Sequence, residues 1–587
     1  MFFAYVGPGA GFAFFSTILL LVLSGIIAVF ALLLLPFKWI RKALNFLVPV
    51  KSARWGLYVL LVVLAVGGSG WWISSLLSEK NHPRMIVLGM DGLDPDIVRN
   101  MMDRGELPNF QRLAERGGLY DLRVPNPPIS PTSWASFITG TNPGRHGIFG
   151  FIGRNTDSYR PELFTKVRAA KDFLGIPPEL NVPGPYKIPL IPSERINKRQ
   201  GEAFWDITSE AGVESTMVRV PVTFPPETVS GKMLSGLGTP DLRGTQGTYS
   251  YWTERTGSNT SKRSGSVDNN VNFYRGTYTS TIEGPTNPLT DERGPTEIDV
   301  TFHKRDTGVA IVPVGTDTFV LKSGQWSSWK KLIFPLGLGQ SVSGVVRFHL
   351  NSTDPFQLYM TPIQINPMDP VMAISHPEGY SRKLAKRIGY FYTMGMAQDD
   401  QALKDETISD QTFLEQSHQG LRERRRIMGL ELRRQTNGLM VAVFDSTDRI
   451  QHLMWRHRDE EHPLYDPAKA SKHADAIPNV YRKMDEILGE VLDATSDDVP
   501  IMVVSDHGFA SFRRQFNVNT WLKKNGYLSL KGGQEATGGR FFRNRRGRFD
   551  VDWSNTKAYQ VGLTGIYLNM EGRESRGTVA PEDKWAV

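Results

Sequence analysis

Three short apolar segments, each followed within two residues by an aspartate, constrain the fold of this chain most strongly. They are MIVLGM at 85–90, LMVAVF at 439–444 and IMVV at 501–504. Continuous apolar runs of this length are typical of parallel strands that helices bury on both faces. Open α/β sheets place functional residues at the carboxyl ends of their strands, where Asp91, Asp445 and Asp506 would lie. The sequence therefore predicts an α/β core, with helices on both faces of the sheet and a site along one edge.

The segments between these strands divide the chain further. A helix is expected over 95–116 and a helical region over 384–434, while residues 245–300, rich in Gly, Ser, Thr and Asn, are expected to form a loop or a mobile lobe. Between 297 and 364, short strand-like runs alternate with Gly turns and predict a β-rich insertion. The expected boundaries are 81–245 for the first part of the core, 246–370 for the loop and the insertion or cap, and 371–587 for the second part of the core.

The first 80 residues have a different character. Apolar runs over 12–35 and 55–77 each approach the ~20 residues that span a bilayer, which predicts two transmembrane helices and a membrane anchor over 1–80. A cleaved signal peptide is the less favoured alternative, because no basic segment precedes the first run and a second run follows. Five Lys and Arg residues lie between the runs and none precedes the first. By the positive-inside rule, the large domain then faces the outer side of the inner or plasma membrane.

The amino-acid composition limits the metal ligands and the partners that this chain can have. Cysteine is absent, which excludes disulfides and thiolate zinc sites and leaves His and carboxylates as the main protein ligands for a metal. Lys and Arg outnumber Asp and Glu by 68 to 60, and much of the excess lies in clusters at 422–426 and 543–548. Because no aromatic-interleaved binding motif accompanies them, the clusters are interpreted as solvated loop or helix surface, and nucleic acid is not an expected partner.

Two Asp/His pairs are candidate metal ligands. Asp448 and His452 are four residues apart, so on a helix they would lie on one face and could share an ion. Asp506 and His507 are adjacent, which suits the irregular backbone after a strand. Taken separately, the first pair could equally be an ion pair on a helix surface, and the second a turn with a capping aspartate. A two-metal site needs such ligands, because two cations about 4 Å apart stabilise both the attacking and the leaving oxygen at phosphorus.

These pairs occur with other motifs in a specific order. Along the chain the motifs are VLGMDGLDP, SPTSWASFITGTNPGRHGIFGF, FDSTDRIQHLMW and VVSDHGF. From about Met85 to the C-terminus this order resembles the alkaline phosphatase superfamily, specifically its type I phosphodiesterase/nucleotide pyrophosphatase branch. The resemblance implies an alkaline-phosphatase-like core sheet and two divalent ions. It implies one ion held by Asp91, Ser130, Asp506 and His507, and the other held by Asp448 and His452.

The resemblance also implies the nucleophile. This family has a Thr or Ser ten residues before the glycine of the TG step, here Gly140, which points to Ser130; Thr132 is the second candidate. A metal-bound hydroxyl loses its proton more easily and can attack phosphorus directly, forming a phospho-enzyme that water hydrolyses. The alternative is that Ser130 has only a structural role, with its hydroxyl in a turn before Pro131.

The chain departs from this branch in three respects. The branch completes its second metal site with a histidine well downstream of the DH motif, whereas no His follows His507, and the expectation is that the sequence is truncated there. The alternative sources within the sequence are His457, His462 and His473. Phe151 stands where diesterase members carry an asparagine that binds a phosphate oxygen, which argues against nucleotide diesters. The segment after Ser130 does not supply the C/S-x-P-x-R context of a sulfatase.

Other residues near the motifs have competing interpretations. Asp445 is expected to be a helix N-cap, or else a residue that orients a ligand. His146 is expected to be structural, because Gly144 and Gly147 flank it in a tight turn. Trp134 and Phe151 are expected either to belong to the core or to wall a pocket.

The predicted function is that of a membrane-anchored hydrolase of phosphate mono- or diesters, with a serine nucleophile and two divalent ions. Mixed His and carboxylate ligands favour Zn²⁺, with Mn²⁺ as the alternative. The predicted spans suggest a substrate near the membrane, such as a lipid head group or an envelope glycoconjugate. Two other functions stay open: transfer of a phospho-group to envelope lipids or glycans, and a non-catalytic envelope protein with a degenerate site.

Overall fold

The computed structural model describes residues 82–168, 171, 177–182, 184–191, 193–254, 266–290, 294–531, 551–563 and 565–587. The two predicted membrane spans, 12–35 and 55–77, lie outside these residues, so the membrane anchor stays a prediction. Among the described helices, none combines the length and the apolar character needed to cross a bilayer.

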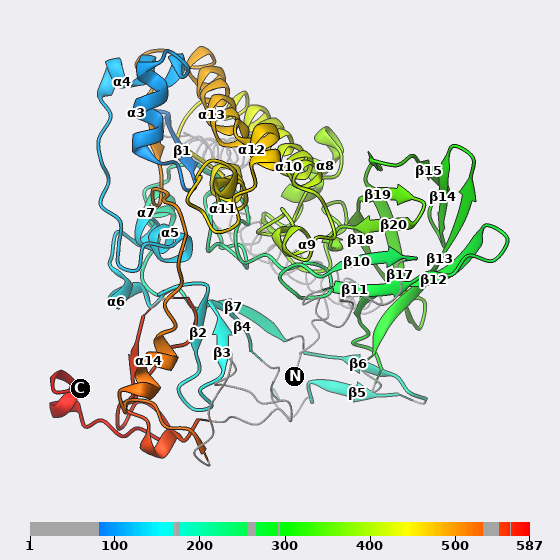
Figure 1. Ribbon diagram of the computed structural model, residues 1–587. Coiled ribbons are helices and arrows are strands. Elements are labelled where there is room, and N and C mark those ends of the chain that lie inside the picture. Colours follow the sequence, from blue (N-terminus) through cyan, green and yellow to red (C-terminus); the bar gives the residue numbers. More distant parts are fainter. Residues whose placement is uncertain are drawn as a thin grey trace, which may run out of the picture. The chain divides into compact units, whose positions relative to one another are not determined.

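A six-stranded sheet forms the centre of the fold (Figure 1), in the order β22-β9-β8-β23-β1-β24. All neighbouring strands are parallel except β22, which runs antiparallel to β9 at one edge. The three predicted strands are confirmed, and they lie side by side. The strand bounds are Met85–Met90 (β1), Ser215–Val218 (β8), Gly231–Leu234 (β9), Ser375–His376 (β22), Leu439–Phe444 (β23) and Ile501–Val504 (β24).

Helices cover both faces of this sheet, as predicted. Ile86, Leu88 and Met90 of β1 pack in one hydrophobic cluster with residues of α3, α10 and α13, whereas Val87 points the other way and packs with residues of α5 and α7. This alternation is the two-residue period of a strand buried on both sides. The helices are α3 (Pro95–Asp103), α5 (Ser130–Thr139), α7 (Phe204–Glu210), α10 (Asp410–Leu432) and α13 (Ala476–Asp493).

The single helix predicted over 95–116 is wrong, because the chain breaks after α3 and restarts at α4 (Pro108–Gly117). Gly105 has a φ of 72°, a left-handed conformation that a helix interior does not contain. Pro108 then lacks an N–H and starts α4 at a position where none is needed. The helical region predicted over 384–434 is likewise divided into α8 (Tyr380–Ile388), α9 (Asp400–Lys404) and α10, and Gly389 ends α8 with a φ of 83°.

A β-rich lobe follows the first part of the core and is built from sheets of five, four and three strands. Residues 245–300 were predicted to form a loop or a mobile lobe; the loop is wrong, because most of the residues described there form β10 to β13 of this lobe. In β13, Ile298, Val300 and Phe302 are buried in the lobe core while the residues between them are more exposed. The strands are β10 (Tyr249–Thr253), β11 (Ser266–Asn270), β12 (Thr277–Thr286), β13 (Pro295–Arg305), β14 (Gly308–Pro313), β15 (Phe319–Leu321), β16 (Gln325–Trp326), β17 (Lys330–Gly337), β18 (Gln340–Val346), β19 (Phe348–Thr353), β20 (Phe356–Met360) and β21 (Gln364–Ile365).

Shorter elements connect and extend these parts. Residues after 518 form a small separate hydrophobic cluster around Tyr559, together with Tyr159. Arg154 of β2 also forms a 2.6 Å ion pair with Glu574 in this C-terminal part. The remaining elements are α6 (Pro143–His146), α11 (Ser446–Met454), α12 (Pro467–His473), α14 (Val518–Lys524), β2 (Ile152–Arg154), β3 (Pro161–Leu163), β4 (Thr165–Arg168), β5 (Glu179–Asn181), β6 (Lys187–Pro189), β7 (Glu194–Asn197), β25 (Ala558–Tyr559) and β26 (Tyr567–Leu568), with 3-10 turns at Trp455–His457, Trp553–Asn555 and Pro581–Trp585. The predicted domain boundaries stay predictions.

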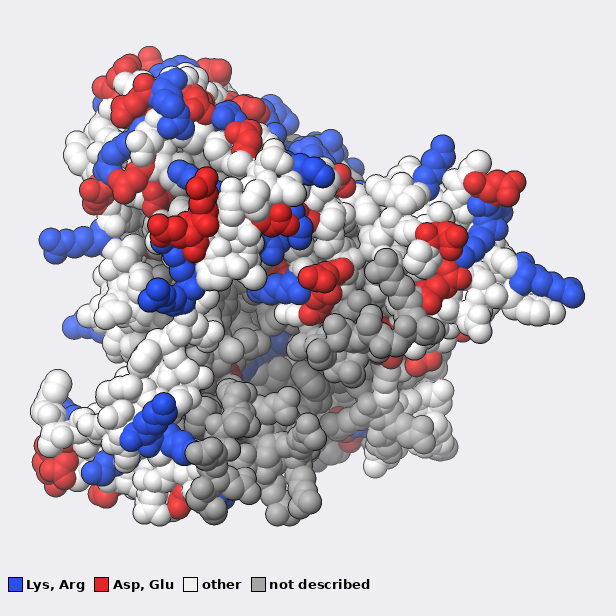
Figure 2. Space-filling view, viewed as in Figure 1, with Lys and Arg blue, Asp and Glu red and all other residues white. Residues whose placement is uncertain are grey.

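Acidic and basic side chains are intermixed over the helical part of the surface seen in Figure 2. The cluster at 422–426 lies on α10, where Arg425 pairs with Glu486 and Glu490 of α13. The prediction that this cluster is solvated surface is wrong for Arg424, which is buried and pairs with Asp445 at 2.5 Å. The cluster at 543–548 lies outside the described residues.

Candidate metal centre

Asp91 lies directly after β1, at the edge where the parallel strands end. The pairing of Met90 with Phe444 places this carboxyl end beside that of β23, and α11 begins there. Gly92 follows with a φ of 67°, and a Cβ at this position would come within 3.0 Å of the Asp448 backbone. The side chain of Thr447 donates to the Asp91 carbonyl at 2.5 Å. The turn after β1 is thereby fixed tightly against α11.

Ser130 is the first residue of α5, and its hydroxyl faces this turn. The Oγ atom lies 3.2 Å from Asp91 Oδ1 and 3.1 Å from His507 Nε2. Thr132, the second candidate nucleophile, is completely buried, and its hydroxyl has no hydrogen-bond partner among the residues described. Of the two hydroxyls, that of Ser130 contacts the other candidate ligands.

Asp506 and His507 lie in the turn after β24, and this turn is attached to the Asp91 turn. The Gly92 N–H donates to Asp506 Oδ1 at 3.0 Å. His507 Nδ1 lies 2.8 Å from the Gly508 carbonyl oxygen, which can only accept, so this contact places the ring proton on Nδ1. In the neutral ring, the lone pair is then on Nε2, which lies 3.4 Å from Asp506 Oδ2 and 3.8 Å from Asp91 Oδ1.

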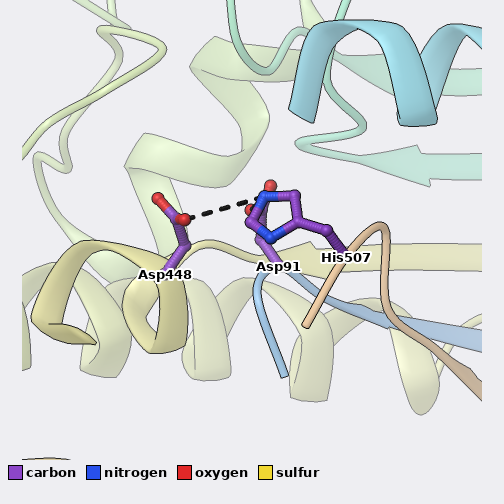
Figure 3. A group of neighbouring side chains, drawn as sticks. All are labelled: Asp91, Asp448 and His507. Atoms are coloured by element: carbon purple, nitrogen blue, oxygen red, sulfur yellow. Dashed lines mark ion pairs between the residues drawn. The ribbon is translucent and has the colours of Figure 1, made fainter. Parts of the chain in front are cut away.

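Asp448 and His452 project from α11, as their four-residue spacing predicts. Asp448 Oδ1 lies 3.1 Å from His452 Nε2 and 3.8 Å from His507 Nε2. Figure 3 shows the Asp448 carboxylate directed toward the His507 ring, with Asp91 behind that ring. His452 is half exposed and its ring packs edge-on against Phe509, which also stacks on Trp455 and contacts the His507 ring. Asp448 therefore lies between the two histidines.

The charges of this cluster favour a cation. Burial, followed by the negative charges of Asp506 and Asp448, raises the pKa of Asp91 well above its ordinary value. Burial also raises the pKa of Asp506. Burial acts in the same direction on Asp448, but His452, together with the charges of Arg449 and His507, outweighs it and lowers the pKa of that carboxyl. Three buried carboxylates that repel one another are the arrangement that a divalent ion relieves.

The ligand atoms themselves fit a metal. Among the described residues, Asp91, Asp448 and His507 are the group of three or more His and carboxylates whose ligand atoms lie within 4.8 Å of one another. Asp448 Oδ1 and Asp506 Oδ2 are buried and have no hydrogen-bond partner of good geometry in the described part of the chain. Carboxylate and imidazole donors suit zinc or manganese. The residues present therefore fit a divalent ion at this edge of the sheet.

The other residues singled out from the sequence lie outside this cluster. Asp445 occupies the N-cap position of α11, as predicted, but its side chain makes no cap hydrogen bond and instead accepts from Arg424 and from Gln398. His146 is buried in its turn and contacts Ser136, and burial lowers its pKa to about 4, in keeping with a structural role.

The alternative histidines have other partners. His457 is buried beside Asp410, with its ring against that of His473, and His462 Nδ1 accepts from the Leu464 N–H. Within the described part of the chain, no hydrogen bond or ion pair joins any of them to Asp448 or His452.

One contact of the centre has no sequence signal. Trp134 is buried in the core, as one of its two interpretations predicts, yet its indole N–H also donates to Asp91 Oδ2 at 2.8 Å. The two residues are 43 positions apart in the sequence, so no local spacing connects them.

The geometry agrees with a comparison to known families. A family model described as Type I phosphodiesterase / nucleotide pyrophosphatase matches residues 85–292 and 361–587. The match contains every residue of the centre, and the unmatched stretch between its two parts lies within the β-rich lobe. No curated protein and no solved structure matches the chain.

Proposed function

The chain belongs to the type I phosphodiesterase/nucleotide pyrophosphatase family and is a phosphoric ester hydrolase, and from this premise we propose that it hydrolyses phosphate mono- or diesters at the centre around Asp91, Ser130 and His507. One observation carries the proposal: the Ser130 hydroxyl lies within 3.2 Å of both a buried carboxylate oxygen of Asp91 and the Nε2 atom of His507. A buried serine needs such neighbours to become a nucleophile.

In the proposed reaction, Ser130 Oγ attacks phosphorus and the bond from phosphorus to the leaving alcohol breaks. Water then attacks phosphorus and breaks its bond to Ser130 Oγ, which restores the serine and releases phosphate from a monoester or a phosphate monoester from a diester. Bound divalent ions would lower the pKa of the hydroxyl and offset the negative charge of the phosphate. The proposed ligand set has two parts. Asp91, Ser130, Asp506 and His507 would hold one ion, and Asp448 and His452 the other, with Zn²⁺ favoured and Mn²⁺ as the alternative.

The substrate and the location of the enzyme are further parts of the proposal. The two apolar runs in the first 80 residues support a membrane anchor, with the catalytic domain on the outer side of the inner or plasma membrane. An ester close to the membrane, such as a lipid head group or an envelope glycoconjugate, would be within reach of an enzyme held there. Transfer of the phospho-group to an alcohol, in place of water, uses the same first step and differs only in the second.

The relative amounts of the products distinguish hydrolysis from transfer of the phospho-group to an alcohol. Full-length protein is incubated with p-nitrophenyl phosphate or with bis(p-nitrophenyl) phosphate, Zn²⁺ or Mn²⁺, and glycerol as an acceptor alcohol. We expect p-nitrophenol and the water-derived phosphate product in equal amounts, because water completes the second step. A shortfall of that product, matched by glycerol phosphate, would assign a transferase. No p-nitrophenol from either ester would contradict the proposed reaction.

A further inference from the structure

Each of the two carboxylate oxygens of Asp91 has its own close contacts. Its Oδ2 atom accepts the indole N–H of Trp134 at 2.8 Å, while its Oδ1 atom lies 3.2 Å from the Ser130 hydroxyl and 3.8 Å from His507 Nε2. Both side chains are buried, with exposed fractions of 1% for Trp134 and 4% for Asp91. If the carboxylate rotated, it would leave a buried indole N–H without an acceptor, which is costly.

The strand that carries Asp91 is shaped for this indole. Val87 and Gly89 share one face of β1, and Asp91, directly after the strand, is the next residue in this alternation. Val87 packs with Trp134 in one hydrophobic cluster, and a Cβ at Gly89 would lie 2.5 Å from the Trp134 ring and 2.8 Å from Val443. Only glycine leaves room for the ring at this point. The edge-on contact of Trp134 with Phe137, at 5.6 Å, supports the ring from its own helix.

We propose that Trp134 is a positioning residue of the metal centre: it fixes the orientation of Asp91, so that one carboxylate oxygen is directed at the ion and the nucleophile. The inference rests on the proposed function, because Asp91 is one of the proposed ligands. Groups that hydrogen-bond to ligating side chains orient them, and the loss of such a group typically weakens metal binding. Trp134 would not be a ligand itself, because an indole N–H has no lone pair for a metal, and it acts through Asp91.

Trp205 supplies a matched control. It is completely buried in the same hydrophobic cluster as Trp134, and its indole N–H also donates to a carboxylate, Glu227 Oε2, at 2.8 Å. Trp134→Phe and Trp205→Phe therefore remove the same type of hydrogen bond from the same core. We expect both variants to lose thermal stability to a similar degree. The metal affinity distinguishes them.

The test is titration of chelator-treated, full-length protein with Zn²⁺ or Mn²⁺ in a calorimeter. We expect Trp134→Phe to weaken binding on the order of 10- to 100-fold, and Trp205→Phe to leave the Kd within about twofold. Gly89→Ala should reproduce the loss, because the added methyl displaces the ring. The double variant Gly89→Ala/Trp134→Phe should bind no worse than the weaker of the two single variants, since both act on one contact.

The outcomes separate this inference from the proposed function. Equal metal affinities in wild type, Trp134→Phe and Trp205→Phe would overturn the positioning role and leave the metal centre intact. Wild-type protein that binds neither ion would overturn the metal centre itself, and the positioning role with it. An equal loss of affinity in both tryptophan variants would also contradict the inference, because it would be a general effect of a weakened core.

Discussion

Ser130→Ala is expected to abolish hydrolysis of a phosphate ester while leaving the fold intact. The Ser130 hydroxyl contacts both Asp91 and His507, and no other serine or threonine hydroxyl makes these two contacts in the described residues. Removing the nucleophile of a covalent hydrolase lowers kcat on the order of 10⁵-fold or more. The measurement is the steady-state rate of p-nitrophenol release by wild type and variant at equal metal loading.

Thr132→Val is the control for this prediction. Its hydroxyl is buried and lacks a hydrogen-bond partner among the described residues, so an isosteric valine removes no described hydrogen bond. We expect the Thr132→Val enzyme to retain a rate within a few-fold of wild type. The opposite pattern, an inactive Thr132→Val and an active Ser130→Ala, would assign the nucleophile to Thr132 and contradict the proposed role of Ser130.

Asp506→Asn is expected to weaken metal binding while raising the stability of the metal-free protein. An asparagine can keep the hydrogen bond that the Gly92 N–H donates to Oδ1, and it removes one of the three buried carboxylate charges. Without that charge, the metal-free variant should melt several degrees above the metal-free wild type at neutral pH. Its Zn²⁺ affinity should fall by about 100-fold or more, because the loss of a charged ligand should cost at least as much as the loss of a group that orients one.

The stability of the metal-free wild type and that of Asp506→Asn should depend on pH to different degrees. The folded-state pKa values of Asp91 and Asp506 are raised, so the stability linked to these groups is fully present below their unfolded pKa. It is lost as the pH rises through the folded pKa. The metal-free wild type should therefore lose stability with rising pH more steeply than Asp506→Asn. Saturating Zn²⁺ should restore about 2.7 kcal/mol to the wild type at 100 times the Kd.

Asp485→Asn is the matched control outside the centre. Asp485 is also a buried carboxylate with a raised pKa, but it accepts three hydrogen bonds from Asn109 and Phe110 and joins α13 to α4. Its asparagine variant should melt below wild type and bind Zn²⁺ with unchanged affinity. If Asp506→Asn behaved in the same way, the charge repulsion inferred at the centre would be contradicted.

The sequence predicted the parts of the site that depend on strand ends and helix periodicity. Asp91 and Asp506 follow apolar strands, and parallel strands bring their carboxyl ends to one edge. Asp448 and His452 lie one helical turn apart, so they had to share a face of α11. Sheet geometry was sufficient to predict that Asp91 and Asp506 lie at one edge, and helix periodicity was sufficient for Asp448 and His452.

Other features depend on contacts between distant segments, and no local pattern carries them. Trp134 has the burial of an ordinary core residue, and only the packed structure shows that its N–H reaches Asp91. Asp445 had the position of a helix cap, but the buried Arg424 of a different helix takes its carboxylate. In β13, Glu297, Asp299 and Thr301 concealed a two-residue alternation, since they lie on the opposite face of the strand from Ile298, Val300 and Phe302, which are buried in the lobe core.

The metal dependence of hydrolysis tests most directly whether the centre around Asp91 is a catalytic metal site. Full-length protein is treated with chelator, its metal content is measured by emission spectroscopy, and p-nitrophenol release is followed while Zn²⁺ or Mn²⁺ is added back. We expect hydrolysis to stop in the metal-free protein and to return in proportion to the ion bound. An undiminished rate in protein shown to contain no metal would contradict a catalytic role for the ion.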